Sequence, residues 1–517
     1  MRRKVTTQET CVERDQANRL IGLLRQEIPG RDVIILDGAM GTMLQSYGLM
    51  PGECPELWNL SHPQHVMDIH RAYIRAGADI IETNTFGGNR IKLAGYGLSE
   101  RAFELNYQGV RLAKEAARGT PVLVAASMGP TGLLMEPFGE MDFDMAYEAF
   151  KEQAMAFREA GADLISIETM SALGEAKAAV MAAREATGLP VICHMTFEHG
   201  GRTLMGTNAL TAVTVLQALG AAAVGANCST GPAGMVGIIR EMAEAATVPI
   251  SAEPNAGLPE FHDGKTLYHE SPEEMARHAR MLVEAGACII GGCCGTTPEH
   301  ISAIRRQVST ILGHARKATA GPCRMPHPFS RQTPLRLAGR GRTVTVDDPL
   351  NLPVLGDEID SWRNPEVAGS LKENDMDAIS HKAREQVARG ANILLVRVDI
   401  PGRDDVDSMR RVVNAIQQVV DVPLVLVSRS PRAVEAGLKA FWGRAFVHVP
   451  GAPGYMTGRD NAGNVDLRGM AGDLEHANVY EEIRSVARRF GALVDPEGAI
   501  EAFISEALLR EATTGRP

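Results

Sequence analysis

Short apolar runs and longer amphipathic segments alternate regularly over about the first 300 residues. Eight runs stand out: 33–37, 78–84, 122–127, 164–169, 191–197, 223–228, 248–254 and 287–294. Each run is continuously apolar, which is typical of parallel strands buried on both faces. Alanine-rich segments of helical periodicity separate them, such as 145–160, 175–187 and 272–285. The pattern predicts eight strand–helix units in an α/β fold, the number and size of a (β/α)8 TIM-like barrel.

Glycines support the predicted helix ends. Gly77, Gly161 and Gly286 each follow a predicted helix and come one step before the next strand, as helix C-terminal signals do. A doubly wound open sheet is the alternative architecture. It is disfavoured because eight regular repeats occur without a dinucleotide-binding glycine fingerprint.

The sequence changes character after the eighth unit. Residues 314–345 contain many Arg and Pro residues and few apolar ones, which predicts an extended basic linker, either a spacer or a docking strip, with the spacer favoured. Beyond it, strands are predicted at 392–398, 422–427 and 445–449, with helices at 378–389, 406–419, 431–441, 479–489 and 500–510. The predicted domains are an N-terminal helical extension (1–30), a barrel (31–313), the linker (314–345) and a C-terminal α/β partial barrel (346–517).

Composition narrows the class of protein. A net charge of -10 and an aromatic content of 5% argue against nucleic-acid binding. We see no apolar stretch long enough to cross a membrane and no secretory signal. Eight unevenly spaced cysteines, two of them adjacent, are typical of a reduced intracellular protein. These features predict a cytoplasmic enzyme.

Three cysteines lie at the ends of predicted strands. Cys228 closes the sixth run, and Cys293 and Cys294 close the eighth. Adjacent cysteines rarely form a disulfide with each other, because the small ring strains the peptide and the sulfur dihedral. An adjacent pair alone favours buried structural thiols. With the third thiol, the pattern predicts a zinc site whose fourth position is open.

Three thiolate ligands indicate the chemistry of such a site. They make the metal electron-rich and a weak activator of water, but suit it to binding a further thiol, which ionises near neutral pH. The predicted reaction is transfer of an electrophilic group, above all an alkyl group, to a substrate sulfur. Hydrolysis is the alternative, although hydrolytic zinc sites more often use His and Glu ligands.

Other strand ends indicate what holds the rest of a thiol substrate. The turn after the first strand carries Gly38, Gly41 and Thr42, and its backbone N–H groups could hold a carboxylate; an ordinary tight loop fits equally well. Asp37 and Glu168 could hold an ammonium group or act as structural caps. Together these features describe a thiol amino acid.

These motifs resemble the zinc-dependent homocysteine S-methyltransferase family, above all the N-terminal homocysteine module of cobalamin-dependent methionine synthase. The matching segments are DGAMGT (37–42), ETNTF (82–86), GPTG (129–132), NC (227–228), EPNAG (253–257) and GGCCGTTP (291–298). The resemblance implies a (β/α)8 barrel over about residues 30–310. It also implies zinc bound by Cys228, Cys293 and Cys294, and homocysteine held by Asp37, Glu168 and the backbone around Gly41 and Thr42.

Residues 346–517 resemble the start of the pterin-binding barrel that follows in methionine synthase. The polar positions do not carry over: a strand-end acid and asparagine fall on Leu395 and Arg397, the next acid on Val427 and a later asparagine on His448. The resemblance therefore implies a truncated, degenerate pterin-binding-like domain. Its exposed sheet edges would need a cover, for which a second copy of the chain is one candidate.

The leading functional prediction is methylation of homocysteine to methionine, with zinc as cofactor and the methyl group supplied by a separate donor, such as methylcobalamin on a corrinoid protein. One alternative keeps methyltetrahydrofolate as donor, bound by the C-terminal domain or by another methyltransferase subunit. Another is a docking or scaffold protein for a corrinoid methyl carrier.

Overall fold

The computed structural model describes residues 19–23, 33–228, 231–262, 265–315, 334–346, 353–402, 404–450 and 473–494. The chain divides into two compact units, one of residues 1–135 and 141–333 and the other of residues 136–140 and 334–517. The predicted helix 500–510, most of the predicted N-terminal extension and residues 316–333 of the predicted linker lie outside the described residues. The predicted domain boundaries stay predictions.

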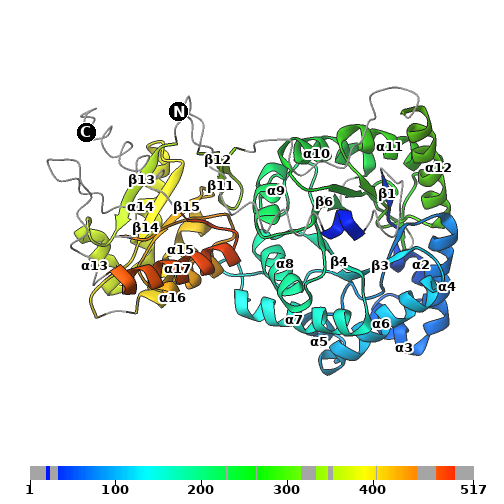
Figure 1. The fold of residues 1–517 in the computed structure, drawn as a ribbon, viewed down its shortest axis with the longest axis horizontal. Coiled ribbons are helices and arrows are strands. Elements are labelled where there is room, and N and C mark those ends of the chain that lie inside the picture. The colour runs from blue at the N-terminus through cyan, green and yellow to red at the C-terminus, as the bar shows by residue number, and fades with distance from the viewer. Residues whose placement is uncertain are drawn as a thin grey trace. The chain divides into compact units, whose positions relative to one another are not determined.

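The first unit contains an eight-stranded parallel sheet with the order β1-β10-β7-β6-β5-β4-β3-β2 (Figure 1). Its strands are β1 (Ile34–Ile35), β2 (Ile80–Glu82), β3 (Leu123–Met128), β4 (Leu164–Met170), β5 (Val191–Met195), β6 (Ala223–Asn227), β7 (Ile250–Glu253) and β10 (Ile289–Ile290). A bridge between Leu36 and Ile80 joins the two ends of the sheet. The predicted (β/α)8 barrel is confirmed.

Helices surround the barrel (Figure 1), and three of them end at the glycines that the sequence analysis identified as helix C-terminal signals. They are α2 (Met40–Ser46), α3 (Trp58–Ser61), α4 (Pro63–Ala76), α5 (Arg90–Ala94), α6 (Ala102–Ala117), α7 (Phe143–Ala160), α8 (Leu173–Thr187), α9 (Ala209–Ala218), α10 (Pro232–Ala245), α11 (Pro272–Ala285) and α12 (Pro298–Ala315), with short 3-10 turns at Pro55–Leu57 and Ser99–Arg101. Gly77, Gly161 and Gly286 follow α4, α7 and α11 with positive φ angles. A hairpin of β8 (Glu260–His262) and β9 (Lys265–Leu267), which the sequence analysis missed, comes between β7 and α11.

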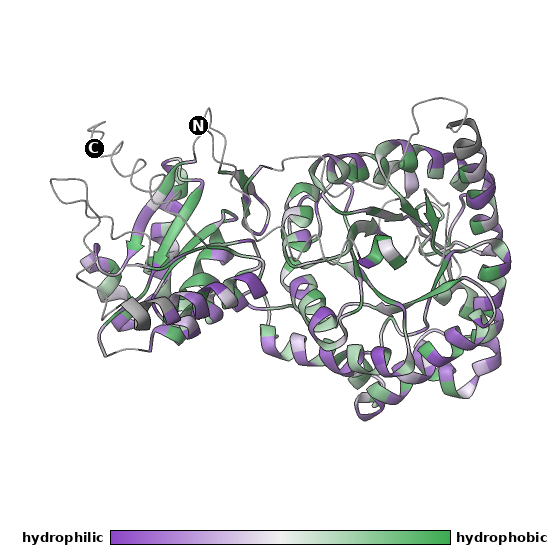
Figure 2. Ribbon diagram, in the orientation of Figure 1, coloured by the Kyte–Doolittle hydropathy of each residue, from purple (hydrophilic) through white to green (hydrophobic). Residues whose placement is uncertain are grey.

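A short helical segment, residues 19–23, fills the inside of the barrel (Figure 1). The side chain of Leu20 is fully buried against inward-facing strand residues such as Ile34, Leu123 and Leu164. Figure 2 shows the same segregation of apolar residues to the strands. Because Leu20 belongs to the central core cluster, this segment stabilises the barrel as well as preceding it in the chain.

The second unit is built on a five-stranded parallel sheet whose strands follow chain order, from β13 to β17. The strands are β13 (Leu355–Asp360), β14 (Ile393–Arg397), β15 (Leu424–Val427), β16 (Phe446–His448) and β17 (Leu493–Val494), and the helices are α13 (Pro365–Glu373), α14 (Met376–Ala388), α15 (Asp405–Val419), α16 (Pro431–Ala440) and α17 (Asp473–Arg489). Sequential parallel strands joined by helices are half of a barrel pattern, as predicted for this domain.

The end of the predicted spacer is structured, which corrects that prediction. Strands β11 (Arg336–Ala338) and β12 (Thr343–Thr345) form an antiparallel hairpin. Leu337 and Val346 are buried in the apolar cluster of the second unit, and Leu335 and Val344 pack against it. These alternating apolar residues lie among arginines, so the charged composition obscured a two-sided strand pattern.

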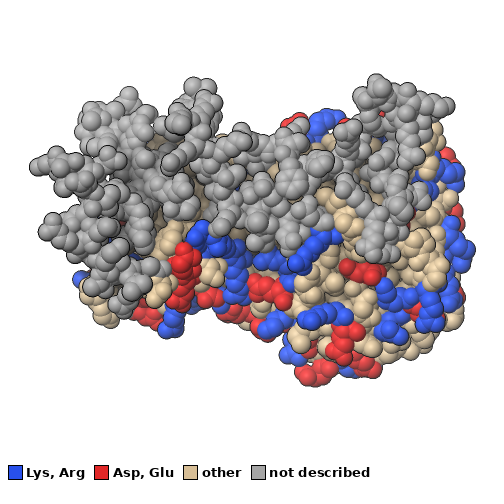
Figure 3. Space-filling model, viewed as in Figure 1, with Lys and Arg blue, Asp and Glu red and all other residues tan. Residues whose placement is uncertain are grey.

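On the face shown in Figure 3, basic and acidic side chains are interspersed over the described residues. None of the described helices combines the length and apolarity that a membrane crossing requires.

Candidate metal centre and substrate site

The structure brings the three predicted thiols together at the carboxyl ends of the barrel strands. Cys228 follows β6, while Cys293 and Cys294 follow β10, and β7 lies between these two strands. The three sulfur atoms all lie within 4.8 Å of one another, and the Cys228 and Cys294 sulfurs are 4.0 Å apart. All three are free, partly exposed cysteines. Strand tips that are not neighbours in the sheet therefore converge, as the sequence predicted.

Backbone hydrogen bonds fix the loops that carry the thiols. The Cys228 N–H donates to the Glu253 carbonyl at 3.0 Å, and the Cys293 N–H donates to the Pro254 carbonyl at 2.8 Å. Cys228 has a φ of 60°, a left-handed conformation that a non-glycine residue adopts at some cost. These bonds tie both thiol loops to the end of β7, so the sulfurs are held before any ligand arrives.

The thiols fit a soft metal cation. Hydrogen bonding to Cys228 raises the pKa of the Cys293 thiol well above its usual value, and the same partner raises the pKa of Cys294 to about 11. Closely spaced thiols resist joint ionisation, and a bound cation would relieve that resistance. Three sulfur donors are the ligand set typical of zinc. The nearby Asn255 is 2% exposed, and its Oδ1 accepts no hydrogen bond from the described residues.

Tyr268, just after β9, adds a polar contact to the thiol cluster that sequence reasoning missed. Its hydroxyl hydrogen bonds to Cys294, and burial together with the thiols raises its pKa. Its ring lies against Gly295, where φ is +81° and an added Cβ would come within 2.3 Å of the ring. Glycine is therefore required beside the thiol pair, but the tyrosine carries no recognisable sequence signal.

The predicted carboxylate-binding residues lie in a helix rather than in an irregular glycine loop. Gly41 and Thr42 are in the first turn of α2, whose initial N–H groups lack intrahelical partners. The Thr42 hydroxyl accepts a hydrogen bond from the Gly295 N–H at 3.1 Å. This contact places the start of α2 beside the thiol loop. The sequence showed the glycines but not the helix, because a seven-residue helix has little periodicity.

The predicted ammonium-binding acids are both buried at the barrel mouth. Asp37 is 3% exposed and Glu168 is 8% exposed. Asp37 Oδ2 accepts from the Glu82 N–H at 3.1 Å, and Glu168 Oε1 accepts from the Ser127 hydroxyl at 2.5 Å. Burial raises the pKa of both carboxyls well above the usual range. Such acids gain from a cation that neutralises them.

Asn227 connects the acid side of the mouth to the thiol side. Its Oδ1 accepts from the N–H of Thr169, the residue after Glu168, at 2.9 Å. Its Nδ2 lies 3.9 Å from the Cys293 sulfur. One side chain therefore contacts both predicted ends of the substrate site.

Three further ionisable residues lie in the mouth that were not predicted as site residues: Glu82, Glu253 and His194. Oxygens of Glu82, Glu168 and Glu253 lie within 4.8 Å of one another. His194 Nε2 is 3.0 Å from Glu253 Oε1, and burial raises the pKa of Glu82 to about 8. The available signal was position, because Glu82 and Glu253 end strands and His194 interrupts an apolar run.

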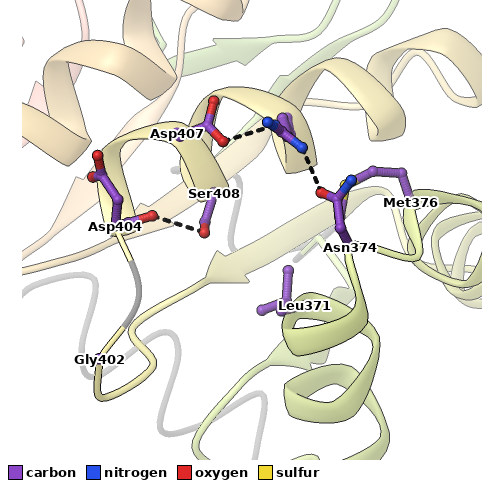
Figure 4. Close-up of a pocket in the computed structure, with 8 residues that line it drawn as sticks. Leu371, Asn374, Met376, Gly402, Asp404, Asp407 and Ser408 are labelled. Carbon is purple, nitrogen blue, oxygen red and sulfur yellow. Dashed lines mark hydrogen bonds and ion pairs between the residues drawn. The ribbon is translucent and has the colours of Figure 1, made fainter.

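The second unit contains a separate cavity of about 350 Å³ (Figure 4). It is lined by Leu371, Asn374, Met376, Gly402, Asp404, Asp407, Ser408 and Arg411. Arg411 pairs with Asp407 at 2.7 Å and donates to Asn374 Oδ1 at 2.7 Å, and Ser408 donates to the Asp404 carbonyl at 2.9 Å. Because these groups satisfy one another, the cavity does not indicate a catalytic site.

The positions where the resemblance places pterin-binding polar residues are different in kind. Leu395 and Val427 are 7% and 3% exposed and belong to the apolar core of the second unit. Arg397 pairs with Asp399 at 3.1 Å and its guanidinium lies 3.7 Å from the centre of the Trp362 ring. These side chains serve packing and local ion pairing within the unit.

Known proteins similar to this chain agree on its family. Residues 34–308 match the family model described as homocysteine S-methyltransferase. The "Methionine synthase" of Mycobacterium tuberculosis is 31% identical over 439 residues, covering 82% of this chain and 36% of the relative. That of Mycobacterium leprae is 31% identical over 434 residues, covering 80% and 35%. The chain thus spans little more than a third of the length of these relatives.

Among solved structures, the metallated form of the homocysteine methyltransferase MmuM from Escherichia coli is 25% identical, with a TM-score of 0.47, covering 55% of this chain and 99% of that one. The family model spans more than half of the 517 residues, and the chain therefore belongs to the homocysteine S-methyltransferase family.

Proposed function

We propose that this chain is a zinc-dependent homocysteine S-methyltransferase that forms methionine, with the methyl group delivered by a methylcorrinoid protein. The observation that carries the proposal is the convergence of Cys228, Cys293 and Cys294 within 4.8 Å at the barrel mouth, inside the segment that matches the family. Bound zinc would supply the positive charge that keeps a substrate thiol ionised near neutral pH.

The protein residues would position the substrate around that charge. Asp37 and Glu168 would bind its ammonium group, and the N–H groups at the first turn of α2, around Gly41 and Thr42, would bind its carboxylate. Asn227 lies between the two sides and would keep them in register. Substrate orientation of this kind lowers the barrier because the sulfur meets the methyl carbon in a fixed direction.

The reaction balances without a redox partner. The thiol proton leaves to solvent, the sulfur lone pair forms the new S–CH3 bond, and the bond between methyl and donor breaks with its electron pair staying on the donor. The apolar character of Leu395 and Val427 supports a donor other than a pterin held by this chain, since neither can pair with a pterin ring.

The test uses the purified, zinc-loaded chain with homocysteine and methylcobalamin carrying a ¹³C methyl group. We expect labelled methionine, detected by mass spectrometry, and its loss in a Cys294→Ala variant. A Cys193→Ala variant is the matched control, because Cys193 is buried within β5 and outside the thiol cluster. Wild-type chain that binds zinc and homocysteine but never forms methionine with any methyl donor would contradict the proposal.

A further inference from the structure

The acids at the barrel mouth form a larger cluster than a single carboxylate pair. Glu82, Glu168 and Glu253 come from β2, β4 and β7, and one oxygen of each lies within 4.8 Å of the others. Asp37 lies beside them and accepts a hydrogen bond from the Glu82 N–H. Glu82 is the partly exposed member of the three glutamates.

Glu253 has an ionisable partner within the protein. His194 Nδ1 lies 3.2 Å from the Ile167 carbonyl, so that nitrogen must carry a hydrogen. His194 Nε2 lies 3.0 Å from Glu253 Oε1, and a proton on either atom leaves this pair with no net charge. Gly225, on the strand between them, permits this contact, since a Cβ there would come within 2.8 Å of the His194 ring.

The other acids of the cluster have more acceptor oxygens than the surrounding protein has hydrogen-bond donors for them. Glu168 accepts from Ser127. By contrast, Glu82 Oε1 and Asp37 Oδ1 are buried atoms that accept no hydrogen bond from the described protein atoms. The Asp37 residue is only 3% exposed. Buried acceptors are normally paired, so these two unpaired oxygens are an independent indication of a ligand that brings hydrogen-bond donors.

An ammonium group would offset the negative charge of these acids and supply hydrogen bonds to their unpaired oxygens, because it carries one positive charge and three N–H donors. We infer that Glu82 is a specificity-determining residue that completes, with Asp37 and Glu168, a receptor for the substrate's ammonium group and selects amino thiols over thiols lacking the amine. The inference rests on the proposed function and adds to it the residue that reads the amino group.

The experiment compares two ligands that differ in that group alone: homocysteine and 4-mercaptobutyrate, which is homocysteine without its amine. Calorimetry with the zinc-loaded full chain measures both affinities for wild type and Glu82→Gln. We expect Glu82→Gln to weaken homocysteine about tenfold to a hundredfold and to change 4-mercaptobutyrate by less than about twofold. Glu175→Gln is the control, since Glu175 is a buried acid outside the cluster that bonds to Thr131.

The outcomes distinguish failure of this inference from failure of the proposed function. Equal weakening of both ligands by Glu82→Gln would make Glu82 a structural residue and overturn the inference alone. Failure of the wild type to bind either thiol would overturn the proposed function and the inference with it. Carboxylate oxygens also suit hard cations. A Glu82-dependent inhibition of homocysteine binding by Mg²⁺ or Ca²⁺ would assign the acids to a metal ion and overturn the inference.

Discussion

At the scale of single residues, the thiol cluster depends on neighbours that do not touch a substrate. Cys228 holds a left-handed φ, Gly295 leaves room for the Tyr268 ring, and the Tyr268 hydroxyl bonds to Cys294. Outer hydrogen bonds of this kind orient metal ligands and tune their charge. The three cysteines were readable in the sequence, whereas their supporting contacts depend on loops that meet only in the closed barrel.

We predict that the zinc-loaded chain holds about one zinc and that Cys294→Ala loses it, because two thiols cannot fill the three protein positions of a catalytic zinc site. Metal analysis by mass spectrometry after gel filtration is the measurement. Cys288→Ala should keep the zinc, since Cys288 is buried just before β10 and does not belong to the cluster. Full zinc retention in Cys294→Ala would remove the assignment.

A second residue-scale prediction concerns His70 in α4, which is fully buried and whose pKa burial lowers from 6.5 to about 3. The unfolded chain takes up a proton at this histidine below about pH 6.5, while the folded chain stays neutral until about pH 3. The titration of His70 therefore leaves the free energy of unfolding unchanged above pH 6.5. Below that pH it lowers the free energy of unfolding by up to about 1.4 kcal/mol per pH unit.

Replacing His70 with leucine should flatten the acid side of the stability curve by that slope. Urea unfolding at pH 7.5, 6.0 and 5.0 measures it, with His199→Leu as the control because His199 is exposed in a loop. An identical pH dependence in wild type and His70→Leu would show that the pKa of His70 is the same in the folded and the unfolded chain, and would contradict the prediction.

At the scale of elements, the sequence predicted the helices and strands that have a clear pattern of apolar residues. Continuous apolar runs located all eight barrel strands, and glycines located the ends of α4, α7 and α11. The β8–β9 and β11–β12 hairpins were missed, because neither lies in a continuous apolar run and arginines surround the apolar residues of β11 and β12. The His194–Glu253 pair was missed for another reason: these residues lie on β5 and β7, and their contact across Gly225 follows from barrel closure.

The helical segment 19–23 gives the element-scale prediction. Leu20 is fully buried in the central cluster of the barrel, so Leu20→Ala should lower the free energy of unfolding by about 2–5 kcal/mol. Urea unfolding followed by circular dichroism measures this, with Leu204→Ala as the control because Leu204 is 71% exposed. Equal stability of wild type and Leu20→Ala would mean that the segment does not support the core in solution.

At the scale of the whole molecule, the two units differ in how much chemistry they carry. The ionisable groups and thiols at the strand ends of the barrel lie close together, and buried carboxylate oxygens of Asp37 and Glu82 accept no hydrogen bond from the described residues. In the second unit, the strand positions compared with a pterin site carry Leu395 and Val427, which are core residues. This contrast supports a catalytic barrel attached to a domain that has another role, such as docking or self-association.

The last prediction tests that division: the chain should not bind methyltetrahydrofolate. A pterin ring has several donors and acceptors, and each one buried without a partner costs about 1–3 kcal/mol. Leu395 and Val427 offer no hydrogen bonds through their side chains, so two such penalties would weaken binding by about one to four powers of ten. Equilibrium titration of the full chain with methyltetrahydrofolate is the measurement, and micromolar binding would refute the degenerate-site interpretation. Binding that appeared only after addition of a second chain with further strands of a pterin-binding barrel would instead show a split domain, and would make the second unit part of the donor site.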